Sequence, residues 1–119
     1  MKIFQIEKDK AKYVTQFNSE FFMNPLLSFD GEYKISFVTL EAGGIIGFHE
    51  AAVSQLMIVV NGSCEVSSED KKYQGAKQGQ VIFWQQGEWH ETISARGMTA
   101  IIIESPALKE SHIHLKKSV

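Results

Sequence analysis

The sequence predicts an all-β protein, built as an antiparallel sandwich or barrel, and two observations support this fold class. From Phe29 onward, short apolar runs are divided by clusters of Gly, Asn, Asp and Ser, which is the usual spacing of strands and turns. Apolar residues at helical spacing are largely missing from the same region. Short strands at regular intervals are typical of sandwiches and barrels.

The first clear strand is predicted around Tyr33 to Phe37. Tyr33, Ile35 and Phe37 alternate there with the polar residues Lys34 and Ser36. Successive side chains of a strand point to opposite faces of the sheet. We therefore expect the three apolar side chains to face the core and the two polar ones to face water.

Later strands are predicted from the breaks between apolar runs. Asn61-Gly62 divides Gln55 to Val60 from Ser63 to Val66, and this dipeptide is a strong signal for a two-residue hairpin turn. Three further breaks, at residues 75–79, 85–88 and 96–97, separate the strands expected over Val81 to Trp84, at Trp89-His90 and over Met98 to Glu104.

Both ends of the chain differ from this strand region. Residues 1–28 are expected to form an arm, in which Lys8 to Phe17 suits either a helical turn or an irregular segment. Phe21 to Met23, with Leu26-Leu27, suits an edge strand interrupted at Pro25. The tail, residues 109–119, is polar and basic, which favours disorder or a loose surface strand.

Length, composition and charge limit the classes of function that this chain can have. A chain of 119 residues with 44% hydrophobic and 22% charged residues predicts one globular domain over residues 1–119. A net charge of -2 argues against nucleic acid as a partner, and no apolar run approaches the roughly 20 residues that span a membrane. Charged residues follow soon after Met1, and Cys64 is the only cysteine, so a cytoplasmic location without disulfides is expected.

Two stretches carry glycines and polar residues at fixed intervals. The first contains Gly43, His49, Ala51, Gln55 and Gly62, and the second contains Gly79, Gln85, Gly87, His90 and Ser94. The intervals resemble the two signature motifs of the cupin superfamily, G-x5-H-x-H-x3-E-x6-G and G-x5-P-x-G-x2-H-x3-N, with no insertion in either. The resemblance covers about residues 33–104 and implies a double-stranded jelly-roll β-barrel with antiparallel strands.

The resemblance also implies a metal site inside the barrel. By position, His49, Gln55 and His90 are the implied ligands, and Ala51 stands where a ligand is lost. The cofactor would be a divalent transition metal (Zn, Fe, Ni, Mn or Cu), weakly held because Gln55 replaces a carboxylate, and a metal-free pocket is the alternative. Glu50 and Glu91 sit beside the two histidines, but strand alternation predicts that they point to the opposite face.

The predicted function is binding of a small ligand in the barrel, around that weakly held metal. One alternative is a metal-dependent oxygenase or isomerase acting on a small organic molecule, and another is a metal-free sensor or sugar-binding module. No catalytic residue is predicted, and Cys64 is expected to be an inert thiol. The expected pocket walls, which flank the ligand positions, are Phe48, Ala51, Met57, Phe83, Trp84 and Trp89.

Two apolar runs suggest that the chain forms an oligomer. Residues 55–60 and 99–103 are apolar on both faces, although the outer face of a small barrel is expected to be partly polar. Something must cover them, and a second subunit is the simplest cover. We therefore expect a homodimer.

Overall fold

The computed structural model describes residues 1–118, and nearly all of its regular structure is strand. The strands are β1 Lys2–Gln5, β2 Lys12–Val14, β3 Phe21–Met23, β4 Lys34–Leu40, β5 Gly44–Glu50, β6 Ser54–Ser67, β7 Gln74–Lys77, β8 Gln80–Trp84, β9 Trp89–Ser94, β10 Met98–Ser105 and β11 Lys116–Lys117. Three short 3-10 turns complete it, η1 Lys8–Lys10, η2 Gln16–Asn18 and η3 Glu110–His112. The predicted all-β class is confirmed.

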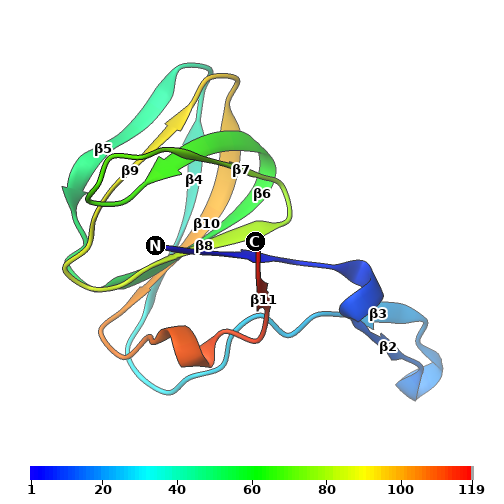
Figure 1. The fold of residues 1–119 in the computed structure, drawn as a ribbon. Helices are drawn as coiled ribbons and strands as arrows, with labels where there is room; N and C mark the ends of the chain where they lie inside the picture. Colours follow the sequence, from blue (N-terminus) through cyan, green and yellow to red (C-terminus); the bar gives the residue numbers. More distant parts are fainter. Residues whose placement is uncertain (119) are drawn as a thin grey trace.

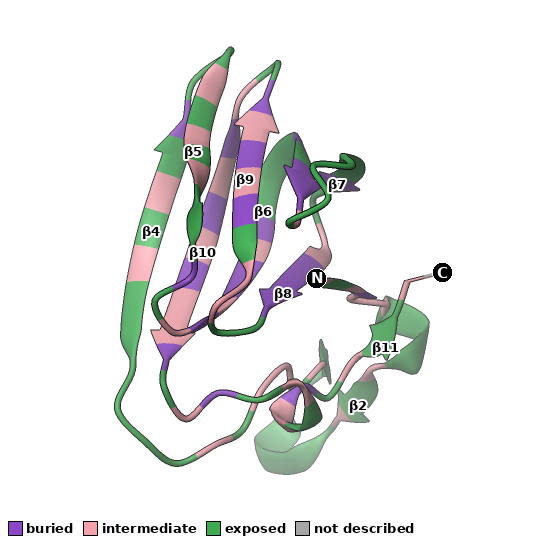
Figure 2. Cartoon of the chain, turned by 60° about the vertical axis from the view of Figure 1, so that its left-hand side comes forward, coloured by how far each residue is buried: buried purple, intermediate pink, exposed green. Residues whose placement is uncertain are grey.

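The main sheet folds over on itself into two layers (Figure 1). One layer has the strand order β11-β1-β8-β6-β10-β4, and the other contains β5, β9 and β7 with the second half of β6. Every strand pair is antiparallel. This is the expected jelly-roll arrangement, and Figure 2 shows β5 and β9 lying over β4 and β10.

Strand β6 corrects the predicted hairpin at Asn61-Gly62. The chain continues through this dipeptide as one strand of 14 residues that belongs to both layers. Its register against β10 shifts by one residue at Val60, just before the dipeptide, which is a β-bulge, and Gly62 has a φ of +85°. The bulge keeps one face buried on both sides of the bend, because Met57 and Val59 before it pack in the same cluster as Cys64 and Val66 after it.

The space between the layers is filled by a cluster of buried apolar side chains, which is the main core. Its members are Leu40, Met57, Val59, Cys64, Val66, Ala76, Ile82, Trp84, Met98, Ala100 and Ile102. The alternation of β4 delivers Leu40 to this core, whereas Tyr33, Ile35 and Phe37 are 65%, 58% and 63% exposed. The prediction that these three residues face the core is therefore wrong, because the register sends the other set of side chains inward.

The ends of the chain cover the outer face of the first layer. Phe4 of β1, together with Leu108 and Ile113 of the tail, packs on Leu56, Val81 and Phe83 as a second buried cluster. Strand β11 pairs with β1 and is exposed, so the tail ends in a short surface strand, which is one of the two forms expected from the sequence. Part of the apolar outer surface that suggested a partner is thus covered within the chain, since Ile58 and Ile103 pack against this second cluster.

The rest of the N-terminal region forms a projecting hairpin rather than an edge strand of the main sheet. β2 and β3 pair only with each other among the described strands, with Val14 opposite Phe21. The segment predicted as a helical turn or an irregular stretch, Lys8 to Phe17, contains the turn η1, strand β2 and the start of η2. None of the helical turns within residues 1–118 is long and apolar enough to cross a bilayer.

Candidate functional site

Two histidines from different motifs meet at one end of the barrel. His49 of β5 lies directly opposite His90 of β9 in the antiparallel ladder, so both side chains project from the same face. Their ring centroids are 4.5 Å apart. A register shift between Ile46 and His49 sets this pairing, because the bulge at Gly47-Phe48 brings His49 rather than Phe48 to the inner face.

The tautomer of His49 follows from its hydrogen bond. Its Nδ1 lies 2.6 Å from the carbonyl oxygen of Gly47, and a carbonyl can only accept. Nδ1 therefore carries the proton and donates it. In the neutral ring, the lone pair is then on Nε2, which is left to accept a hydrogen bond or to coordinate a metal.

His90 is a buried, neutral imidazole. It is 3% exposed, and burial together with the neighbouring charge of His49 lowers its pKa to about 4. Its Nε2 atom has no hydrogen-bond partner within residues 1–118. The ring also contacts the indole of Trp84, with centroids 4.5 Å apart. At neutral pH this histidine offers an uncharged ring in an apolar wall.

The structure places the other predicted interior residues as follows. Gln55 is half-buried on the inner face of β6, opposite Trp84 of β8, while Met57 and Trp84 belong to the main core. Ala51 is buried, and both its backbone groups bond to the turn before β9, to Glu88 and Gly87. Gln55 thus points into the same interior as the histidine pair, from the opposite layer, and Trp84 lies opposite Gln55 and in contact with His90.

Three predicted pocket walls lie outside the barrel, which corrects that part of the prediction. Phe83 packs in the second cluster beneath the chain ends, because Trp84 takes the inward position of β8. Phe48 stacks on Trp89 with ring centroids 5.3 Å apart, and the Lys71 ammonium lies 4.6 Å from the centre of the Phe48 ring. Trp89 is exposed because it alternates with the inward His90.

Glu50 and Glu91 point away from the histidines, as strand alternation predicts. A third acidic residue, Glu104, was not predicted to lie near the site. Glu50 pairs with the outward Trp89, and Glu91 accepts a hydrogen bond from the Tyr73 hydroxyl, so neither joins the histidines. Glu104 lies opposite Gln55 and shares its inward face. The even-numbered inward positions of β10, from Met98 onward, could have indicated Glu104. Within the described part of the chain, no three His, Cys, Asp or Glu side chains are grouped closely enough to hold a metal.

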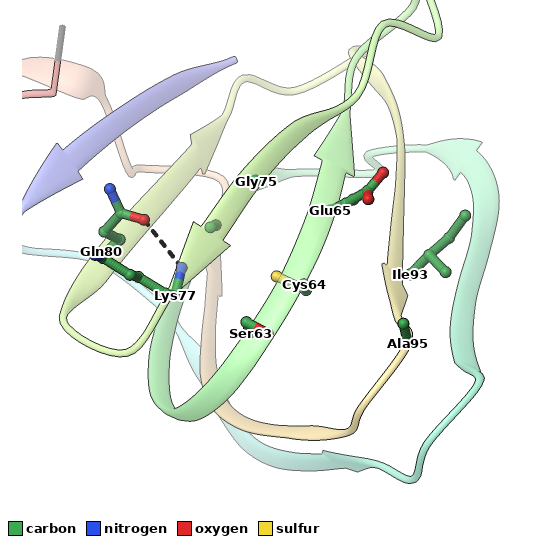
Figure 3. A pocket seen from close by; sticks show the side chains of 9 residues that line it. Ser63, Cys64, Glu65, Gly75, Lys77, Gln80, Ile93 and Ala95 are labelled. Carbon is green, nitrogen blue, oxygen red and sulfur yellow. Dashed lines mark hydrogen bonds between the residues drawn. The ribbon is translucent and has the colours of Figure 1, made fainter.

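A hollow of about 560 Å³ lies away from the histidines, against β6, β7 and β9 (Figure 3). Glu65, Ile93 and Gln80 line it, and the Gln80 side chain is already bonded to the Lys77 backbone N–H at 2.9 Å. Burial raises the pKa of the Cys64 thiol at its edge to about 11. That thiol stays protonated at neutral pH, which agrees with the inert cysteine expected from the sequence.

Comparison with known proteins finds no match by sequence but several by fold. No protein-family model and no curated protein matches the sequence. A solved RmlC-like cupin from Shewanella frigidimarina is 23% identical, with a TM-score of 0.60 over 72% of this chain and 77% of its own. A cupin superfamily protein from Desulfitobacterium hafniense is 12% identical, with a TM-score of 0.59 over 68% of this chain and 73% of its own. The chain has the cupin fold.

A third similar structure is described as a predicted oxalate decarboxylase, from Thermotoga maritima. It is 18% identical to this chain, with a TM-score of 0.56 over 62% of this chain and 65% of its own. Likeness at this identity shows the cupin fold alone, so the chemistry must be argued from the residues present. In this cupin barrel the matched motif positions His49 and His90 are the pair in contact.

Proposed function

We propose that the cupin barrel binds a small polar molecule at the end where His49 and His90 meet. The observation that carries the proposal is the Nε2 atom of His90, which is buried without a hydrogen-bond partner within residues 1–118. A buried polar atom without a partner is unfavourable by roughly 1–3 kcal/mol, and such atoms are rare in folded proteins. A ligand that donates a hydrogen bond to this nitrogen, or a metal bound by it, offsets that cost.

Polar groups and the Trp84 indole surround this nitrogen. His90 is neutral because its pKa is lowered to about 4 by burial, and His49 presents Nε2 because its Nδ1 is bonded to Gly47. The half-buried Gln55 adds an amide that both donates and accepts. His49 is exposed, so the site opens to solvent. These groups suit a compact ligand with hydrogen-bonding groups, placed against the Trp84 indole.

A weakly held divalent transition metal is the finer part of the proposal. The imidazoles of His49 and His90 would bind Zn, Fe, Ni or Cu through Nε2, and the Gln55 amide oxygen, which also suits Mn, would be a third donor. The set carries no negative charge, so retention is expected to be poor. A bound metal would supply a Lewis acid to the ligand, and an oxygenase or isomerase activity would depend on the same residues.

Substitution of Gln55 with Glu is expected to strengthen metal binding. The change adds a carboxylate to two imidazoles with little change in size, so Ni²⁺ or Zn²⁺ should raise the melting temperature more than in the parent. In the absence of metal, the buried charge should make Gln55→Glu less stable than the parent. Thermal denaturation of untagged protein with and without each metal measures both effects.

The matched control is Gln78→Glu, which adds the same charge at an exposed position outside the barrel. It should respond to metal as the parent does. If metal shifts the melting temperatures of the parent, Gln55→Glu and Gln78→Glu equally, the three residues do not form a metal site. A metal-free binding site at His49 and His90 is then the remaining form of the proposal. It predicts that His90→Gln abolishes the binding of imidazole-sized polar compounds measured by NMR.

A further inference from the structure

The exposed hydrophobic residues gather on two surfaces of the molecule. Residues 1–118 contain twelve large hydrophobic side chains that are exposed, and eight of them lie on these surfaces. The first surface is the β2–β3 hairpin, Lys12 to Met23. From here on the word arm means this hairpin alone. Its exposed residues are Tyr13, Phe17, Phe21, Phe22 and Met23. The second is the outer side of β4, which we call the β4 face, with Tyr33, Ile35 and Phe37. Scattered exposed hydrophobics need no explanation, but two gathered patches do.

The arm is ordered but has little support of its own. A two-stranded hairpin is at best marginally stable by itself in water. The Tyr13 ring contacts the Phe22 ring, with centroids 5.0 Å apart, and the Lys8 ammonium lies 4.8 Å from the centre of the Phe22 ring. The Asn24 side chain bonds to the Glu7 carbonyl at 3.2 Å and fixes the base of the arm. These contacts shape the arm without burying its aromatic side chains.

The tip of the arm is strained as well as exposed. Phe17 has a φ of +58° and Asn18 has the same φ. Asn tolerates this left-handed conformation, whereas a bulky aromatic residue rarely adopts it. Phe17 is also 95% exposed, the largest value among the exposed hydrophobics of residues 1–118. Strained backbone conformations cluster at active sites, ligand clamps and switch regions.

The β4 face belongs to an edge strand. Among the described strands β4 pairs only with β10, so its other edge has no strand beside it. It is seven residues long, and two of its outward residues, Ile35 and Phe37, are apolar, with Tyr33 just before the strand continuing the same alternation. Natural proteins rarely leave such an edge open, because it promotes association with another chain. The neighbouring outward residue of β10, Ile101, is half-buried opposite Phe37 and extends the patch, whereas Ile103 packs against the second buried cluster.

We propose that the arm of one copy packs on the β4 face of a second copy, forming a closed twofold dimer with two identical contacts. Figure 2 shows β4 at the left of the molecule and β2 at the lower right, and Tyr33, Ile35 and Phe37 are exposed, so the arm does not cover the β4 face of its own chain. A reciprocal exchange buries both patches at once and closes the assembly at two copies. Phe17 is the anchor residue, seated among Tyr33, Ile35 and Phe37 of the partner copy.

The available area supports a second copy as the occupant. A fully exposed large side chain offers on the order of 200 Å², so eight that are about half exposed offer roughly 800 Å² per copy. A standard stable interface buries about 800 Å² on each partner. The arm and the β4 face of one chain therefore supply the surface that a stable dimer needs, without any further partner.

Sedimentation or light scattering coupled to size exclusion tests the dimer at micromolar concentration. We expect the parent to be a dimer, and we expect Phe17→Asn and Phe37→Thr each to weaken it at least tenfold. Asn preserves the left-handed tip and Thr preserves the strand, so both variants should keep the fold, checked by circular dichroism. Ile45→Thr is the matched control, because Ile45 is 57% exposed on β5 in the other layer. It should leave the dimer unchanged.

Mixing the two variants tests which surfaces meet. Phe17→Asn retains an intact β4 face and Phe37→Thr retains an intact arm, so a mixture of the two can form one intact contact. Dimer in the mixture, well above the level in either variant alone, is the expected result. If mixing restores no dimer, the patches meet face to face or arm to arm, and the proposed exchange is wrong. A monomeric parent, or equal weakening by Ile45→Thr, overturns it as well.

Discussion

Acidification from pH 7 to pH 5 is expected to reduce the free energy of unfolding by about 2 kcal/mol through His90 alone. Burial lowers the pKa of His90 to about 4 in the folded protein, against an ordinary value of 6.5. Between these values the unfolded chain binds a proton that the folded chain does not. Stability from this residue is therefore fully present above pH 6.5 and is lost as the pH falls toward 4.

Urea unfolding at half-unit pH steps measures this loss. The interval from pH 7 to pH 5 is informative because carboxylates remain largely ionised in it, so acid denaturation through them falls below the window. His90→Gln serves as the control, since it keeps a neutral polar side chain but removes the titration. A parent and a control with the same slope between pH 7 and pH 5 would contradict the buried neutral histidine, and with it the basis of the ligand site.

Substitution of Gly62 with Ala is expected to destabilise the fold by about 3 kcal/mol or more, because two costs add. The φ of Gly62 is +85°, a conformation that costs an Ala about 1–2 kcal/mol. A Cβ at this position would also lie 2.4 Å from the Gly97 carbonyl oxygen and 2.9 Å from the Met98 Cα. Both are backbone atoms next to or within β10, so relief requires the strand to move.

Gly43→Ala separates these two costs. Gly43 has a nearly equal φ of +83°, but a Cβ there would meet nothing within 4 Å. This variant should therefore show the conformational cost alone, about 1–2 kcal/mol. The difference between the two variants in urea unfolding reports the close approach of β6 and β10. Equal losses would mean that β10 shifts at no cost, which would contradict the close approach of the two strands at Gly62.

The fold class was predictable because alternation and turn residues report on strands locally. Asn61-Gly62 shows where such local evidence fails. Its left-handed glycine suits either a hairpin turn or a bulge, and the choice depends on β8 and β10, which pair with β6 from both sides. The prediction that Ile35 and Phe37 face the core was wrong for a related reason. Alternation identifies two faces, but only the register with β10 decides which face meets the core.

The histidine pair was predictable because its positions follow from fixed motif spacing. The residues that line the pocket around this pair were harder to predict, because neighbours in sequence such as Phe83 and Trp84 point to opposite faces of the sheet. Choosing between them requires knowing which face a second cluster covers. Glu104 was missed because it lies far from both motifs in sequence, and pairing of β10 with β6 brings it opposite Gln55.

The pairing of β4 with β10 has a consequence for biosynthesis. β4 leaves the ribosome early, whereas β10 emerges only after every other strand of the barrel core has been made. β1 likewise waits for β8. Pairings between segments so distant in sequence form slowly, and apolar strands without neighbours are prone to aggregate. The nascent chain is therefore expected to need shielding by chaperones until translation of β10 is complete.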